Sequence, residues 1–147
     1  MSTTFEILLF YAYVPIEDPD NVARMQRETC EALGIKGRVI VAHEGINVTL
    51  EGTAENTSEY LRQLVTDERF KNIHIKRSPG TGSAFPRLSV KVRPEIVSLH
   101  LGENDVDPRT TTGKYIEAEE LHRLIHSGKE FYIIDMRNDY EHAVGRF

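Results

Sequence analysis

The succession of strand-like and helix-like segments is the feature that most constrains the fold of this chain. The apolar run Phe5–Tyr13 predicts a strand. Asp18 followed by Pro19 is a strong start signal for a helix, because aspartate caps the first turn and proline fits the first helical position. Apolar residues then recur at helical spacing until Gly34, a residue typical of a helix C-terminus. The chain therefore opens with a strand and a helix of about four turns.

A hairpin and a second helix are predicted next. Residues 38–42 and 48–50 have the composition of two short strands, and the stretch HEGIN, residues 43–47, would form the turn between them. We expect Gly45 and Asn47 to supply the special backbone angles of that turn. A capping pattern that starts at Asn56 then predicts a helix over residues 56–65.

Two more strands complete the first domain. Residues 73–76 and 88–92 carry alternating side chains, and the loop SPGTGSAFP separates them. The first six of these elements follow the order β-α-β-β-α-β, which predicts an α+β fold of the ferredoxin-like kind, in which two helices pack on one face of an antiparallel sheet. We assign residues 1–100 to this domain.

The last third of the chain has a different organisation. Residues 101–114 are acidic and contain Pro, Thr and Gly, as expected of an interdomain linker. In residues 115–147 we expect a helix over 117–126 and a buried strand over 131–134 that runs into an Asp-Met-Arg loop. A buried strand needs neighbours on both sides. We therefore expect residues 115–147 to be the incomplete beginning of an α/β domain, and residues after about 105 to be mobile or poorly packed.

Basic residues are concentrated in one segment of the chain. Residues 69–93 carry seven basic and no acidic side chains, whereas the whole chain has a net charge of −5. The seven are Arg69, Lys71, Lys76, Arg77, Arg87, Lys91 and Arg93. Strand alternation would place Ser89, Lys91 and Arg93 on one face. This segment is either a site for a phosphate-rich partner or an ordinary solvated surface.

Two further segments have both a functional and a plain interpretation. A hairpin turn has no need of the histidine and glutamate that precede Gly45, so HEGIN is either a site or a turn with incidental polar residues. The glycine-rich SPGTGSAFP loop lacks the length and the Lys-Ser/Thr ending of a P-loop. We expect it to be a mobile connection, although its basic flanks would allow it to close on a phosphate.

No residue of this sequence is a strong candidate for catalysis. Cys30 is the single cysteine, and it lies on the apolar stripe of the first helix, where a buried core thiol is expected. His122 and His126 share a helix face, but no third metal ligand stands near them in the sequence. We therefore predict no catalytic residue and no metal site.

Composition excludes several classes of protein. With 39% apolar and 28% charged residues, the chain has the composition of a globular protein and not of a disordered or fibrous one. No apolar run approaches the roughly 18 residues of a membrane helix, and the first residues lack the features of a signal peptide. We expect a cytoplasmic protein without a membrane partner.

Several stretches together resemble a known family. They are LGIKGRVIVAHEGINVTLEGT, DERF, SPGTGSAFPRLSVKVRPEIVSL and FYIIDMRNDYEHAVGRF. In this order they resemble the bacterial rhodanese-domain tRNA uridine hydroxylases, long catalogued as rhodanese-related sulfurtransferases. The resemblance implies an acylphosphatase-like, ferredoxin-like domain followed by a rhodanese domain, of which 115–147 would be the truncated start.

The resemblance also implies an activity. Members of the family hydroxylate the wobble uridine of tRNA at position 5 with molecular oxygen as co-substrate, and no metal or flavin is established as cofactor. Their essential cysteine would lie beyond Phe147, so we expect this chain alone to be inactive. Asp135 and Arg137 match an early rhodanese motif and are expected to be scaffold residues. Acylphosphatase activity is disfavoured, because residues 11–15 contain neither glycine nor arginine.

Two hypotheses about function follow. In the first, residues 1–100 position tRNA, weakly when the missing rhodanese domain is absent, through phosphate contacts. The candidate RNA-binding residues are Lys76, Arg77, Arg87, Lys91, Arg93, His43 and Asn47. In the alternative, the domain is an interaction module that supports a thiosulfate-type sulfurtransferase and does not touch RNA.

Overall fold

The computed structural model describes residues 4–97, 106–107, 110–137 and 139–145. The chain divides into two compact units, residues 1–111 and residues 112–147. Half of the predicted linker over 101–114 falls outside the described residues.

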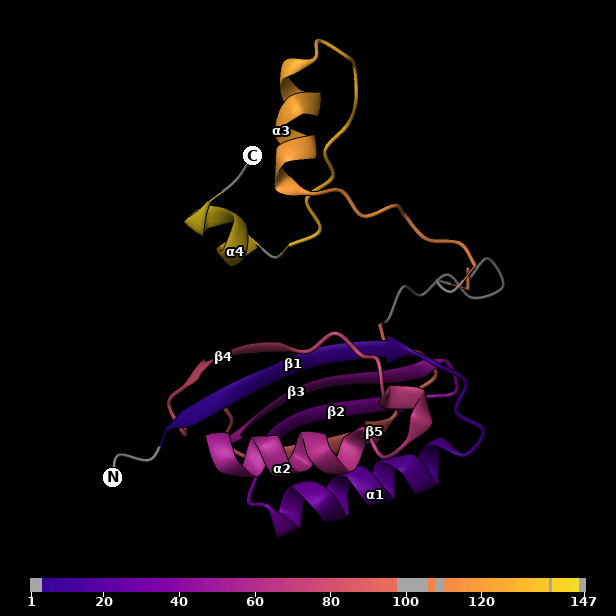
Figure 1. The fold of residues 1–147 in the computed structure, drawn as a ribbon, viewed down its shortest axis with the longest axis vertical. Coiled ribbons are helices and arrows are strands. Elements are labelled where there is room, and N and C mark those ends of the chain that lie inside the picture. The colour runs from indigo at the N-terminus through magenta and orange to yellow at the C-terminus, as the bar shows by residue number, and fades with distance from the viewer. Residues whose placement is uncertain (1–3, 98–105, 108–109, 138, 146–147) are drawn as a thin grey trace. The chain divides into compact units, whose positions relative to one another are not determined.

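Besides a short 3-10 helix over Glu68–Phe70, the described part of the first unit contains five strands and two α-helices (Figure 1). In chain order they are β1 (Phe5–Tyr13), α1 (Pro19–Ala32), β2 (Lys36–Ala42), β3 (Gly45–Thr53), α2 (Ala54–Leu64), β4 (Lys76–Gly80) and β5 (Leu88–Val92). The sheet order is β4-β1-β3-β2-β5, and only the pair β2 and β5 is parallel. Four antiparallel strands with both helices on one side form the ferredoxin-like arrangement, so the predicted fold class is confirmed. Strand β5 extends this sheet beside β2.

Local signals of the sequence explain the position of α1. The Asp18 carboxylate accepts a hydrogen bond of 3.0 Å from the Asn21 N–H, and Pro19 is the first helical residue. Gly34 follows the helix with a φ of +63°, a backbone conformation that residues with a side chain rarely adopt. The predicted start and end signals of this helix are thus both confirmed.

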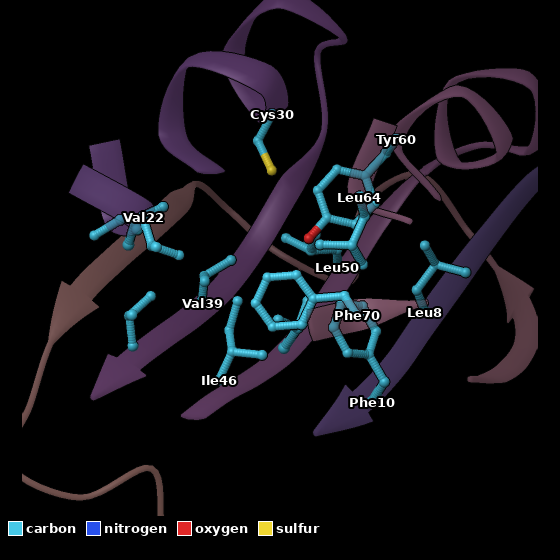
Figure 2. Close-up of a cluster of buried hydrophobic side chains, with 14 of the residues drawn as sticks. Leu8, Phe10, Val22, Cys30, Val39, Ile46, Leu50, Tyr60, Leu64 and Phe70 are labelled. Atoms are coloured by element: carbon cyan, nitrogen blue, oxygen red, sulfur yellow. The ribbon is translucent and has the colours of Figure 1, made fainter. Parts of the chain in front are cut away.

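The main core lies between the sheet and the two helices (Figure 2). Leu8, Phe10 and Leu50 point from the sheet toward the helices and are almost completely buried. Tyr60 of α2 enters the same core, and its hydroxyl donates to Gln26 Oε1 at 2.5 Å. The buried phenol therefore keeps a hydrogen-bond partner. Each apolar side chain buried here stabilises the fold by about 1.5–3 kcal/mol.

Several predicted boundaries were wrong. Strands β2 and β3 span 36–42 and 45–53 instead of the predicted 38–42 and 48–50. Thr53 caps α2 by accepting from the Asn56 N–H at 3.2 Å, so the helix begins two residues before the predicted cap. The strand predicted over 73–76 begins only at Lys76 and continues through Ser78, Pro79 and Gly80, which the sequence suggested as loop. An edge strand tolerates proline, because one side of it needs no backbone donors.

The second unit contains two helices among its described residues. They are α3 (Ala118–His126) and α4 (Asp139–Val144). The helix predicted over 117–126 is confirmed apart from one residue. The strand predicted over 131–134 is not formed, and Tyr132 is 96% exposed. No other strand lies in the described part of this unit, so the segment has no neighbour with which to complete backbone hydrogen bonds.

Candidate functional site

Alternation along the strands gives the sheet two different faces. Both helices lie on one side of the sheet (Figure 1), and we call the other side the open face. The strand pairing assigns to the open face Phe5, Ile7, Leu9, Tyr11, Tyr13, Lys36, Arg38, Ile40, Ala42, Gly45, Asn47, Thr49, Glu51, Thr53, Lys76, Ser78, Gly80, Ser89 and Lys91. Four of these residues are basic and one, Glu51, is acidic.

The single carboxylate of the open face is enclosed by backbone. Glu51 Oε1 accepts hydrogen bonds of 2.8 Å from the N–H groups of both Thr81 and Gly82, and Oε2 accepts one of 2.7 Å from Ala84. The residue is 4% exposed. Burial alone would raise the pKa of this carboxyl, but the backbone donors outweigh burial and lower the pKa below its ordinary value. Glu51 is thus a charged group that presents almost no surface to a ligand.

The glycine-rich loop is therefore not the phosphate-binding or mobile loop that the sequence suggested. Its N–H groups point at a side chain of β3. A Cβ added at Gly80 would lie 2.7 Å from Glu51 Oε1, and one added at Gly82 would lie 2.8 Å from the Phe5 ring. Both approaches are too close for a side chain. The glycines allow the loop to lie against the sheet and close on a carboxylate instead of a phosphate.

The HEGIN stretch, like Glu51, uses side chains to bind the backbone of another segment. Glu44 Oε1 accepts from the Ile96 N–H at 2.6 Å, and Asn47 Nδ2 donates to the Ile96 carbonyl at 3.1 Å. Side chains of HEGIN therefore form hydrogen bonds with both the N–H and the carbonyl of Ile96. Ile96 is 2% exposed and lies outside the main core. Asn47 points to the open face, so the segment after β5 is fixed against that face.

The other HEGIN residues fix the hairpin itself. His43 Nδ1 donates to the Ile16 carbonyl at 2.9 Å, while the Ile16 N–H donates to the His43 carbonyl at 2.9 Å. Gly45 has a φ of +154°, and an added Cβ would lie 1.9 Å from the Ala12 carbonyl oxygen. The special backbone angle was predicted correctly for Gly45. Asn47 instead lies inside β3 and contributes its side chain.

The predicted RNA-binding residues do not form one cluster. Lys76 and Arg77 lie on β4, whereas Lys91 lies on β5 at the opposite edge of the sheet. Arg77 stands opposite Leu8 and therefore on the helix side, where its guanidinium pairs with Glu6 at 3.2 Å. The exposed Arg87 and Arg93 flank β5. Only Lys76, Lys91 and Asn47 belong to the open face.

Sequence reasoning missed the central residues of the open face. Arg38 of β2 is exposed and points to this face, as does Tyr11 of β1. Alternation within residues 5–13 and 38–42 carried the signal, but the strands predicted there were not divided into two faces. Which side chains meet across strands depends on pairing, which the sequence does not state.

The two remaining predicted groups are the thiol of Cys30 and the pair of Asp135 and Arg137. Cys30 is buried, and burial, together with the charge of Glu31, raises the pKa of its thiol to about 12. It is therefore the core cysteine that the sequence predicted. In the second unit, Arg137 Nη2 and Asp135 Oδ2 form an ion pair of 2.6 Å. Hydrogen bonds from Arg137 lower the pKa of the Asp135 carboxyl to about 2.

The described residues contain neither a metal site nor a membrane-spanning helix. No three His, Cys, Asp or Glu side chains among them gather in a way that could hold a metal ion. None of the described helices combines the length and the apolar character needed to cross a membrane.

Several curated proteins are similar to nearly the whole chain. The tRNA uridine(34) hydroxylase of Staphylococcus carnosus is 45% identical over 97% of this chain and 44% of its own length. The proteins of the same name from Enterococcus faecalis and Bacillus licheniformis are 44% and 40% identical over 97% and 100% of this chain, and in both cases 45% of their own length. This chain thus spans less than half the length of these relatives.

Solved structures and a family description agree with the fold. A BLUF protein, BlrB, in its dark state superimposes with a TM-score of 0.51 at 24% identity over 87% of this chain and 89% of that chain. A bacterial light-regulated adenylyl cyclase gives 0.52 at 16% identity over 84% of this chain and 36% of that one. Residues 5–96 match the family described as UPF0176 acylphosphatase-like domain. The chain therefore belongs to the UPF0176 family, and its resemblance to the tRNA uridine hydroxylases is confirmed.

Proposed function

We propose that this chain is the tRNA-positioning part of a tRNA uridine hydroxylase. The similarity to proteins named tRNA uridine(34) hydroxylase over at least 97% of the chain supports this proposal. The complete enzyme would use molecular oxygen to hydroxylate the wobble uridine, would act in the cytoplasm, and would contain a rhodanese domain that supplies the reactive cysteine.

The charge of the open face is the observation that carries the positioning role. Lys36, Arg38, Lys76 and Lys91 are exposed there, and the single carboxylate of that face is enclosed by the loop. A polyanion that approaches the strands of this face therefore meets four exposed cations, and the strand residues described there include no exposed carboxylate. Phosphate contacts of this kind fix the orientation of a nucleic acid and make its affinity depend on salt.

Catalysis by this chain alone is not expected. Cys30 is the single cysteine of the sequence, and its raised pKa keeps the buried thiol protonated. Asp135 and Arg137 pair with each other and would serve as scaffold of the rhodanese domain. We expect the purified chain to bind tRNA weakly and to form no 5-hydroxyuridine.

A titration with tRNA at two salt concentrations tests the positioning role. The test variant is Lys91→Glu with Arg93→Glu, and the matched control is Arg24→Glu with Arg62→Glu, which changes the net charge equally on the exposed helices. We expect the test variant to bind more weakly, with a smaller dependence on salt, and the control to change less. Equal affinities of the two variants would contradict a specific role for β5.

A second candidate is supported by the apolar surface of the same face. Leu9 is 43% and Tyr11 53% exposed, which would also suit a protein interaction surface. In this case the unit would shape a thiosulfate-type sulfurtransferase without touching RNA. Assays of the complete protein for 5-hydroxyuridine in tRNA and for sulfur transfer from thiosulfate would distinguish the two candidates.

A further inference from the structure

The strand pairing places five open-face residues in one row across the entire sheet. From β4 to β5 this central row is Lys76, Leu9, Thr49, Arg38 and Ser89. The adjacent row is Tyr11, Asn47, Ile40 and Lys91. The two rows together form a strip in which Leu9, Tyr11 and Ile40 flank the polar Thr49 and Asn47 of β3, and cations lie toward both edges.

Described segments cover each end of the open face, and Leu9 and Tyr11 stay partly exposed between these described covers. The Glu51-bound loop covers the end near Phe5, since the Phe5 ring lies close to Gly82. The Ile96 segment is held against the other end by Asn47. Between these two covers, Leu9 and Tyr11 expose about half of their surface. The strip is therefore a bounded surface that crosses the strands.

Unpaired RNA is the ligand whose chemistry fits this surface. Proteins that bind single strands combine aromatic side chains, on which bases stack, with cations that contact the phosphates. Tyr11 supplies an exposed ring, and an edge-on contact with Tyr13, 6.0 Å between ring centroids, supports its orientation. A protein partner would have to neutralise the cations at both edges, whereas RNA carries the required negative charge along its backbone.

We propose that unpaired nucleotides lie across this strip, with one base stacked on Tyr11 and phosphates contacting Arg38 toward one edge and Lys76 at the other. This inference rests on the proposed tRNA-positioning function and specifies the contact. The RNA element recognised would be a loop and not a duplex, because a paired base cannot present its face to a side chain.

Direct binding of RNA to the full 147-residue chain tests the contact. The probes are an oligouridine that carries one 2-aminopurine, an RNA stem-loop, and a fully paired duplex of equal length, all at low salt. Stacking on Tyr11 should quench the 2-aminopurine fluorescence, and the single-stranded probe and the stem-loop should bind more tightly than the duplex.

Three variants of tyrosine separate stacking from other roles. Tyr11→Ala should weaken binding of the single strand about tenfold or more and abolish the quenching, whereas Tyr11→Phe, which keeps the ring, should retain both. Tyr132→Ala is the matched control, since this tyrosine is 96% exposed in the other unit.

Arg38→Gln and Lys76→Gln test the phosphate contacts, and each should lower the salt slope of RNA binding by about one. Circular dichroism checks that every variant is folded.

The outcomes separate the inference from the function on which it rests. If the chain binds tRNA in a salt-dependent manner but Tyr11→Ala binds as tightly as the original chain, the stacking inference is overturned and the proposed function stands. Loss of binding in Tyr11→Phe would also overturn it, because the hydroxyl and not the ring would then be responsible. Failure of the original chain to bind any of the RNAs, tRNA included, would overturn both.

Discussion

The two faces of the sheet are held in place by different physical means. On the helix side, apolar side chains such as Phe10 and Leu50 are buried between sheet and helices. On the open face, the covering segments are held mainly by two carboxylates that accept hydrogen bonds from backbone N–H groups, Glu51 under the loop and Glu44 beside Ile96. One face therefore determines whether the unit folds, while the other determines which surface it presents.

The largest effect is expected on the helix side. Leu50→Ala removes a fully buried side chain from the middle of β3 and leaves a cavity, which should lower the free energy of unfolding by about 2–5 kcal/mol. Denaturant unfolding followed by circular dichroism measures this change. A loss below about 1 kcal/mol would mean that the helix side is not the main source of stability.

A smaller and more local effect is expected for the glutamate under the loop. Glu51→Gln replaces an acceptor by a group whose NH₂ cannot accept from the loop, so at least one buried N–H loses its partner, at a cost of about 1–3 kcal/mol. Amide hydrogen exchange should accelerate at Thr81, Gly82 and Ala84. Exchange that accelerates equally throughout the core would show that the two faces are not separable.

The free energy of unfolding should depend on acidic pH differently in the original chain and in Glu51→Gln. Because the folded-state pKa of Glu51 lies below its ordinary value, its contribution to stability is present at neutral pH. It is lost as the pH falls below the ordinary pKa of about 4.3 and through the lowered folded-state pKa. The difference in unfolding free energy between the original chain and Glu51→Gln should therefore shrink in that range. A difference that grew on acidification would contradict the lowered pKa.

The smallest effect is expected for the ion pair between β1 and β4. Arg77 is half exposed, so solvent screens its interaction with Glu6, and Arg77→Gln should cost less than about 1 kcal/mol. The same variant should leave RNA binding nearly unchanged, since Arg77 lies on the helix side. A loss of RNA affinity as large as that of Arg38→Gln would break the assignment of the two faces.

Local features of the fold were predictable from the sequence, and long-range ones were not. The start and end signals of α1 are local, since Asp18 and Pro19 stand at its start and Gly34 follows its end. This helix was predicted correctly. The strand β4 was misplaced, because Ser78-Pro79-Gly80 has turn composition and becomes a strand only through its pairing with residues 5–7 of β1. In the same way, residues 131–134 have the composition of a strand but pair with nothing in the described part of their unit.

The candidate site was predictable only in part. The excess of basic residues over 69–93 was visible, but its division between opposite edges follows from the sheet order. The contact between Glu51 and its loop spans about thirty residues and has no sequence signature. HEGIN was correctly singled out as unusual, yet its Glu44 and Asn47 hold a backbone segment that the sequence does not identify as their partner.

The proline inside β4 has a consequence for the behaviour of the chain in solution. Strand β4 ends the sheet on one side, and an unpaired edge can recruit a strand of another molecule and start aggregation. Pro79 has no N–H to offer, and the neighbouring Lys76 and Arg77 repel a second copy of the same edge. At the opposite edge, the short β5 carries Lys91. Both edges thus discourage self-association, a property that would keep the protein dispersed at high concentrations.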